Sequence, residues 1–155
     1  MPKPLTEMSL QELWRLFPIQ LTPHRDEWRD WYAAEARQLQ NLLHDHIHAI
    51  AHIGSTAIPG IWAKPIIDIL IEVADKTALQ NAATILTAHG YLQMSASANR
   101  ISLNKGYTPQ GFAERVFHIH LRLPDDHDEY EFRDYLQAHP DIAKQYEALK
   151  LSLLK

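Results

Sequence analysis

Two apolar segments carry the side chains best suited to metal or acid-base chemistry. In IIDILIEV, residues 66–73, Asp68 and Glu72 alternate with apolar residues, and in RVFHIHLRL, residues 115–123, His118 and His120 do the same. Successive side chains of a strand point to opposite faces of a sheet, so each segment predicts a strand with one apolar and one polar face. If the two strands are neighbours, the Asp68 carboxylate and both imidazoles converge.

Asp68, His118 and His120 together are a ligand set for a divalent metal such as Mn, Zn or Fe. The alternative is a half-exposed sheet face with ordinary polar residues. The His-X-His spacing alone favours that alternative, because strand alternation produces such spacing by chance. Asp68 is the stronger signal, since aspartate is depleted in strands and an ionised carboxylate among isoleucines must be paired, metal-bound or solvated.

The Gly54-Ser55-Thr56 segment directly follows a predicted strand. Gly54 has no Cβ to block a ligand, and the backbone N–H groups and hydroxyls of this segment can cradle a phosphate. By itself a Gly-Ser pair is more often a plain turn. Five cations flank the strands that carry the acid and the histidines and are candidate charge partners, although each one singly is typical of a solvated surface side chain: Lys64, Arg100, Lys105, Arg115 and Arg122.

The elements that must position these residues follow an α-β-β-α-β-β-β-α-α pattern. Residues 9–12 predict a capping box that opens a short helix, Thr22-Pro23 predicts the start of a long amphipathic helix through Leu43, and Pro59-Gly60 predicts a type II turn. The other predicted elements are strands 47–53 and 66–73, a helix from Asp75 or Thr77 to His89, strands 91–95, 101–105 and 116–123, a helix opened by Asp128, and a last helix from Pro140 to about Leu154. The pattern predicts an α/β (α+β) fold with a mixed sheet.

The composition fits one globular domain over residues 1–155, with 46% hydrophobic and 22% charged residues. The net charge of −4 gives no overall electrostatic reason to bind nucleic acid or an anionic membrane, so an anion site must be local. The absence of cysteine excludes disulfides and is compatible with a reducing cytosol. Without a signal-like start or a long apolar segment, we expect a cytoplasmic protein that does not span a membrane.

The segment HIGSTAIPGIWAKPIIDILIEV, residues 52–73, resembles the signature of the GrpB family. IQLTP before Trp28, RISLNKG at 100–106, HIHL at 118–121 and FRDYLQAHPDIAKQYEALK at 132–150 agree with the same family. The resemblance covers nearly the whole chain. It implies a nucleotidyltransferase-like fold.

In the wider nucleotidyltransferase superfamily, a Gly-Ser pair after the first strand precedes a strand with two aspartates at alternate positions, and a later strand adds a third carboxylate. The resemblance matches Gly54 and Ser55 to the pair and Asp68 to the first aspartate. Leu70 stands at the second position, and the later strand offers His118 and His120 instead of a carboxylate. These differences weaken the implied case for two-metal nucleotidyl transfer, because carboxylates neutralise the metals.

Two hypotheses follow from these residues. In the first, a divalent metal (Mg, Mn or Zn) held by Asp68, His118 and His120 supports the transfer or cleavage of a nucleotide or other phosphorylated small molecule, with Asp68 as the catalytic residue. Gly54, Ser55 and Thr56 then cradle the phosphate, which is neutralised by Lys64, Arg100 or Lys105. In the second, the domain is a non-catalytic nucleotide- or coenzyme A-precursor-binding module. Members of the family also occur fused to dephospho-coenzyme A kinase, which implies an adenine nucleotide or coenzyme A connection.

Overall fold

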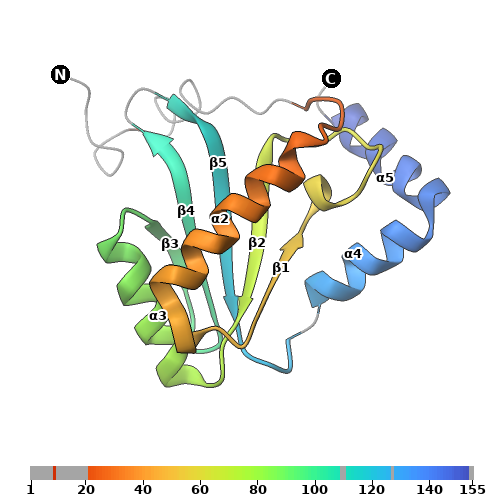
Figure 1. Cartoon of the computed structure of the whole chain (residues 1–155). Coiled ribbons are helices and arrows are strands. Elements are labelled where there is room, and N and C mark those ends of the chain that lie inside the picture. The colour runs from red at the N-terminus through yellow and green to blue at the C-terminus, as the bar shows by residue number, and fades with distance from the viewer. Residues whose placement is uncertain (1–8, 10–20, 109–110, 127, 154–155) are drawn as a thin grey trace.

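A computed structural model describes residues 9, 21–108, 111–126 and 128–153 (Figure 1). The short helix predicted to open at residues 9–12 lies outside the part of the chain described in full. The observed elements are α2 (Glu27–Leu43), the 3-10 turn η2 (His44–His46), β1 (Ala49–Ile53), the 3-10 turn η3 (Ser55–Ala57), β2 (Ile66–Glu72), α3 (Lys76–Ala88), β3 (Leu92–Ala96), β4 (Arg100–Thr108), β5 (Gly111–Arg122), α4 (Asp128–Ala138) and α5 (Pro140–Leu153).

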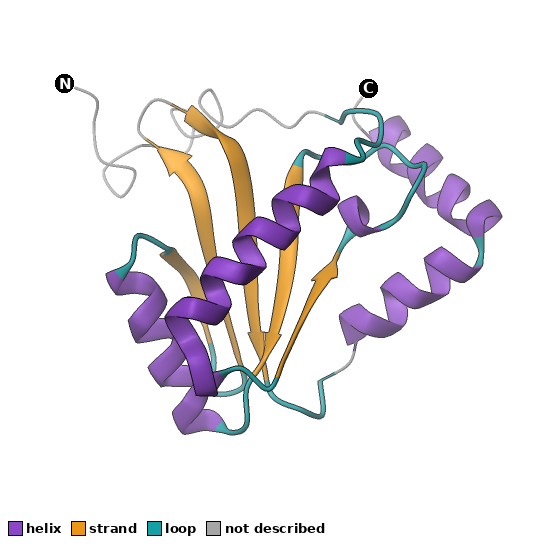
Figure 2. Ribbon diagram, viewed as in Figure 1, coloured by secondary structure: helices purple, strands orange, loops and turns teal. Residues whose placement is uncertain are grey.

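The strands form one mixed sheet in the order β1-β2-β5-β4-β3 (Figure 2). β2 and β5 run parallel at its centre, while the other three neighbouring pairs are antiparallel. The predicted α/β class with a mixed sheet is therefore confirmed. β4 and β5 extend further than predicted, because residues 106–115, whose glycines, proline and charges suggest a loop, continue the two strands on either side of 109–110.

The apolar face of the central strands builds the main core. Ile67, Ile69 and Ile71 of β2 are fully buried beside Phe117, Ile119 and Leu121 of β5. Trp28 and Leu39 of α2 and Leu79 and Leu86 of α3 close this side. Figure 1 shows α2 lying across the sheet, with α3 near the β3 edge. The polar positions of β2 and β5 consequently occupy the other face.

The N-terminus of α2 differs from the prediction. The helix begins at Glu27, after an Asp26 N-cap, and not next to Thr22-Pro23. Thr22 instead pairs with Ala63 through two backbone hydrogen bonds of 2.9 and 3.0 Å. A tertiary contact therefore overrides the local capping signal. Asp75 caps α3 as expected, accepting a hydrogen bond of 2.8 Å from the Ala78 N–H.

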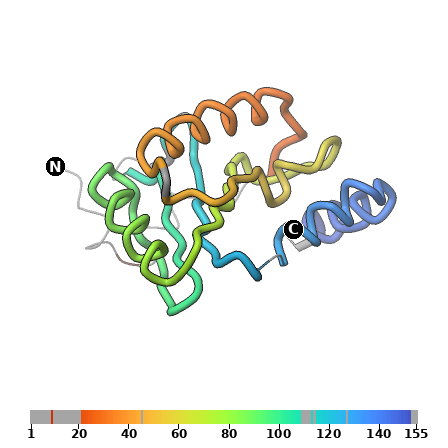
Figure 3. Tube along the Cα trace, turned by 60° about the horizontal axis from the view of Figure 1, so that its bottom comes forward, coloured from red at the N-terminus to blue at the C-terminus, as the bar shows by residue number. Residues whose placement is uncertain are grey.

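Helices α4 and α5 hold the connection between β1 and β2. Figure 3 shows this helix pair and α2 on opposite sides of that connection. Leu136 and Ala143 pack with Ile58 and Ile61 of the connection in a small second core. Three long side chains of the helices also donate hydrogen bonds to backbone carbonyls of this region: Arg133 to His52, Gln137 to Ala57 and Lys144 to Gly60. The predicted structured connection is thus fixed by distant residues.

Among the described residues, the structure contains no helix with the length and apolar character needed to cross a membrane.

Candidate functional site

Asp68, His118 and His120 meet on the polar face of the sheet. The parallel register pairs Asp68 with His118 and Leu70 with His120, which puts these side chains on one face. Asp68 Oδ1 lies 2.9 Å from His120 Nε2 and 3.6 Å from His118 Nδ1. The predicted convergence of the acid with both imidazoles is confirmed. Each of the three side chains is partly exposed, between 21% and 29%.

The cluster continues through hydrogen bonds to residues on both sides. Tyr107 Oη lies 2.7 Å from His118 Nε2, and Arg122 Nη2 lies 3.3 Å from His120 Nδ1. Because the guanidinium can only donate, His120 Nδ1 accepts and His120 Nε2–H donates to Asp68. Burial lowers the pKa of His118, and His120 and Lys64 act in the same direction against the opposing Asp68 carboxylate.

This arrangement does not fit a metal ion as it stands. Both imidazoles approach the same Asp68 oxygen, and their other ring nitrogens are engaged by Tyr107 and Arg122. Among the described residues, no three His, Cys, Asp or Glu side chains are grouped so that they could hold a metal. A metal at Asp68 would have to replace the 2.9 Å hydrogen bond to His120. The metal ligation expected from the sequence therefore requires these side chains to rearrange.

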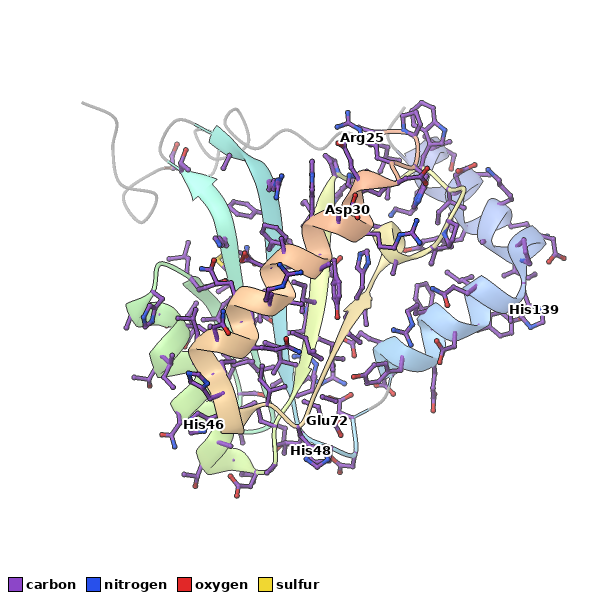
Figure 4. The ribbon with its side chains drawn as sticks, in the orientation of Figure 1. Arg25, Asp30, His46, His48, Glu72 and His139 are labelled. Carbon is purple, nitrogen blue, oxygen red and sulfur yellow. The ribbon has the colours of Figure 1, made fainter. Side chains whose placement is uncertain are left out.

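Glu72, the next acid on this face, belongs to the far end of β2. Figure 4 shows Glu72 and His48 close together there, and the His48 N–H donates to the Glu72 carbonyl at 2.7 Å. Arg122 lies opposite Glu72 in the sheet and contacts Glu129 of α4 at 3.3 Å. Glu72 thus lies at the end of β2 away from Asp68, which pairs with Ile53 next to the turn at Gly54.

Gly54 gives the turn beside Asp68 its shape. Its φ of 75° and ψ of −173° lie in a region that is essentially restricted to glycine. A Cβ at this position would overlap Asp68 Oδ2 and lie 3.0 Å from its Cγ. The backbone therefore runs directly against the carboxylate. Ser55 follows directly, at the start of η3.

The hydroxyls of Ser55 and Thr56 have different partners. Ser55 Oγ accepts a hydrogen bond of 2.9 Å from Lys150 Nζ of α5. Thr56 is 3% exposed and its Oγ1 lies 2.9 Å from His52 Nε2. The His52 ring stacks on Tyr32 of α2 with centroids 5.0 Å apart, and burial lowers the pKa of His52 to about 4. Ser55 thus faces a cation, whereas Thr56 is engaged inside the fold.

Two lysines contribute positive charge near the turn. Burial lowers the pKa of Lys150, the Lys64 charge lowers it further, and the Asp68 carboxylate opposes both. Lys64, which the sequence predicted as a phosphate-binding residue, also lowers the pKa of His118 through its charge. Within the described part of the chain, neither lysine forms an ion pair with a carboxylate. Ser55 of this turn therefore contacts a cation, while Gly54 lies against the Asp68 carboxylate.

Lys105 and Arg100 are not brought to this cluster. Lys105 is on the opposite face, with Nζ 2.8 Å from both oxygens of Glu35 in α2. Glu35 also accepts a hydrogen bond of 2.7 Å from Tyr91. Arg100 donates two hydrogen bonds, of 2.6 and 2.8 Å, to Asp126. The sequence predicted that Arg100 and Lys105 bind phosphate because their chain positions lie near the site residues. Strand alternation instead directs Lys105 to the core side, and Asp126 binds Arg100.

Sequence reasoning missed Lys150, Tyr107 and Glu129. Lys150 follows Asp68 by more than eighty residues, and only its helix packing brings it to Ser55. Tyr107 belongs to the part of β4 that looked like a loop. Its alternation with Lys105 does not predict the side it takes, because the β4–β5 register shifts between these two residues.

The sheet order and the central parallel pair are those of the nucleotidyltransferase-like fold. A cytoplasmic RNA terminal U-transferase shares this fold with a TM-score of 0.54, at 13% identity over 83% of this chain and 40% of that one. The family model described as GrpB protein matches residues 18–155. The chain belongs to the GrpB family.

Curated and solved relatives agree with this assignment. The UPF0157 protein YqkA of Bacillus subtilis is 35% identical over 150 residues, covering 93% of this chain and 43% of YqkA. The crystal structure of the conserved protein GrpB from Enterococcus faecalis superposes with a TM-score of 0.75, at 31% identity over 86% of this chain and 82% of that one. A dephospho-CoA kinase of Mycolicibacterium paratuberculosis is 28% identical over 87% of this chain and 39% of the kinase. This chain thus spans less than half of YqkA and of the kinase.

Proposed function

We propose that the domain binds the phosphate group of a nucleotide or other phosphorylated small molecule over the Gly54-Ser55 turn. The observation that carries this proposal is the Lys150 ammonium on Ser55 Oγ, at 2.9 Å, in the turn that follows Gly54. Lys64 adds a second positive charge. Hydroxyl and ammonium donors at a glycine turn favour a phosphate oxygen as acceptor.

The relatives indicate which phosphorylated compounds to test first. The similarity to a protein named dephospho-CoA kinase supports adenine nucleotides and coenzyme A precursors as the first compounds to test. A thermal-shift series with AMP, ATP and dephospho-coenzyme A, each with and without Mn²⁺ or Mg²⁺, tests the proposal, since ligand binding to the native state raises the unfolding midpoint. A parent protein whose midpoint none of these compounds raises would refute it.

Ser55→Ala and Lys64→Ala should each weaken the binding of the stabilising nucleotide. The first removes a hydroxyl from the turn and the second removes an exposed ammonium, so the free energy of unfolding should change by no more than about 1 kcal/mol. Calorimetric titration measures the affinity and urea unfolding measures the stability. Lys76→Ala, at the start of α3, is the control that should leave both unchanged. If both test variants unfold early but keep their nucleotide affinity, the Gly54-Ser55 segment has a structural role and does not bind the ligand.

Metal-dependent transfer of a phosphate-containing group is the second candidate. It rests on the residue types of the cluster, one carboxylate and two imidazoles on one face of the sheet. In this candidate Asp68, His118 and His120 turn apart to hold Mg, Mn or Zn. The metal would supply charge neutralisation at the phosphate.

For this second candidate, Mn²⁺ or Zn²⁺ affinity should fall steeply as the pH drops from about 7.5 to 5.5, because protons compete for imidazoles with a reference pKa of about 6.5. Because the pKa of His118 is lowered, the loss of metal affinity due to protonation of His118 should occur toward the acidic end of this pH interval. Calorimetric metal titrations on the parent, His118→Ala, His120→Ala and Asp68→Asn measure it. Parental affinity and pH profile in both histidine variants would eliminate the candidate.

A further inference from the structure

The charge balance around the Gly54-Ser55 turn differs from that of a metal-binding site. A metal that bridges a phosphate to a protein requires anionic ligands, and several carboxylates usually provide them. Here Asp68 is the carboxylate beside the turn, and the position two residues further along the same face is the buried Leu70. Against this carboxylate stand the ammonium groups of Lys64 and Lys150. The two lysines exceed the carboxylate by one positive charge.

The packing of α5 fixes the position of the Lys150 ammonium. Tyr146, one helical turn earlier, packs on the second core of Ile58 and Ile61, and Lys150 Nζ lies 5.2 Å from the Tyr146 ring centroid. Lys144 anchors the same helix at the Gly60 carbonyl. The side chain of Lys150 is thus held before a ligand arrives, which reduces the entropy lost on binding.

We propose that Lys150 is the built-in cation of the phosphate site and that it replaces a divalent metal there, so that the site takes a metal-free phosphate monoester. This inference rests on the proposed phosphate-binding function. The Lys150 ammonium and the Ser55 hydroxyl both lie within reach of one phosphate oxygen, and Lys64 balances the second negative charge of a monoester. A divalent cation brought in by a triphosphate would be repelled by the same two ammonium groups.

The experiment is calorimetric titration with AMP near neutral pH, in EDTA and then with Mn²⁺, on the parent and three α5 variants. For the parent we expect AMP to bind in EDTA, with a change of less than about twofold on adding Mn²⁺. Lys150→Met should lose about tenfold or more in affinity, the effect of removing one charge-assisted hydrogen bond. Lys150→Arg should keep affinity within about threefold, because the charge remains. Lys144→Met is the matched control, since it loosens α5 from Gly60 but leaves the ammonium at Ser55.

The outcomes separate this inference from the function on which it rests. AMP binding that requires Mn²⁺ overturns the built-in cation and leaves phosphate binding standing. Parental affinity in Lys150→Met also overturns it. Equal losses in Lys150→Met and Lys144→Met assign the effect to helix docking and overturn it as well. Failure of AMP, ATP and inorganic phosphate to bind the parent with or without metal removes the proposed function itself. Urea unfolding of each variant confirms that the titrated protein is folded.

Discussion

Replacing Gly54 by alanine should destabilise the fold by about 3 kcal/mol or more and abolish phosphate binding. Two independent penalties add at this position. The backbone angles, with φ at 75° and ψ at −173°, are essentially closed to residues with a Cβ. The new methyl group would also overlap Asp68 Oδ2, and it would lie 3.1 Å from the Asp68 Cβ. Either the turn or the carboxylate must move, and both belong to the site.

Gly60→Ala is the matched control for this prediction. Gly60 also has a positive φ, of 82°, but no described atom lies within 4 Å of a Cβ built there. Gly60→Ala should therefore lower the free energy of unfolding by the backbone cost alone, about 1–2 kcal/mol. Urea unfolding measures the stability lost in each variant. The difference between the two losses is the steric cost of the contact with Asp68. If the two glycines cost the same, the steric argument for Gly54 is wrong.

A double variant tests whether Asp68 is the obstacle. Asp68→Ala removes the carboxylate that the Gly54→Ala methyl group would overlap, so the combined loss should be smaller than the sum of the two single losses. Residues in direct contact couple in this way, by about 0.5–3 kcal/mol. Strict additivity would show that the turn and the carboxylate do not touch in solution.

The sequence predicted the central geometry because strand alternation and residue type carry it. The polar set of Asp68, His118 and His120 could be assigned to one face from the two-residue period alone, and the only unknown was whether the two strands are neighbours. The parallel β2–β5 pairing supplies that step. Gly60 shows the same kind of local control, since its φ of 82° matches the second central position of the predicted type II turn.

Residues that depend on tertiary packing could not be predicted. Lys105 looked like a phosphate partner because it ends a strand segment near the histidines, but it alternates with the buried Ile101 and Leu103, and Glu35 of α2 binds it on that side. Arg100 pairs with Asp126 of the segment after β5. Lys150 reaches Ser55 only because the small core of Ile58, Ile61, Leu136 and Ala143 docks α5 against the connection. No local pattern in the sequence encodes these contacts.

Leu70 explains why the acid pattern of this face cannot simply be completed. It is fully buried between Ala51 of β1 and His120 of β5 in the sheet, two positions after Asp68. A carboxylate there would lose its hydration and would lie near the Asp68 charge, and both effects disfavour ionisation. Leucine at this position therefore fills a buried site in the sheet at the expense of a second anionic ligand.

Leu70→Asp should consequently destabilise the protein by at least about 3 kcal/mol near neutral pH, since it combines a lost apolar side chain with a buried charge. The pKa of the introduced carboxyl should be raised in the folded state above its unfolded value of about 3.9. A raised pKa means that the folded state binds the proton more tightly, so the deficit relative to the parent should be smallest at low pH and should grow as the pH rises toward the folded pKa. Urea unfolding of parent and variant at matched pH values measures that deficit.

Leu70→Asn separates the charge from the change of shape. The amide has nearly the same size as the carboxyl but does not ionise, so its deficit relative to the parent should be constant with pH. The difference between the two variants then reports the electrostatic cost of a second acid beside Asp68. Equal, pH-independent deficits would show that water or a cation already reaches this position. In that case burial does not explain leucine here, and the charge argument for Lys150 as the cation of the site loses one of its two supports.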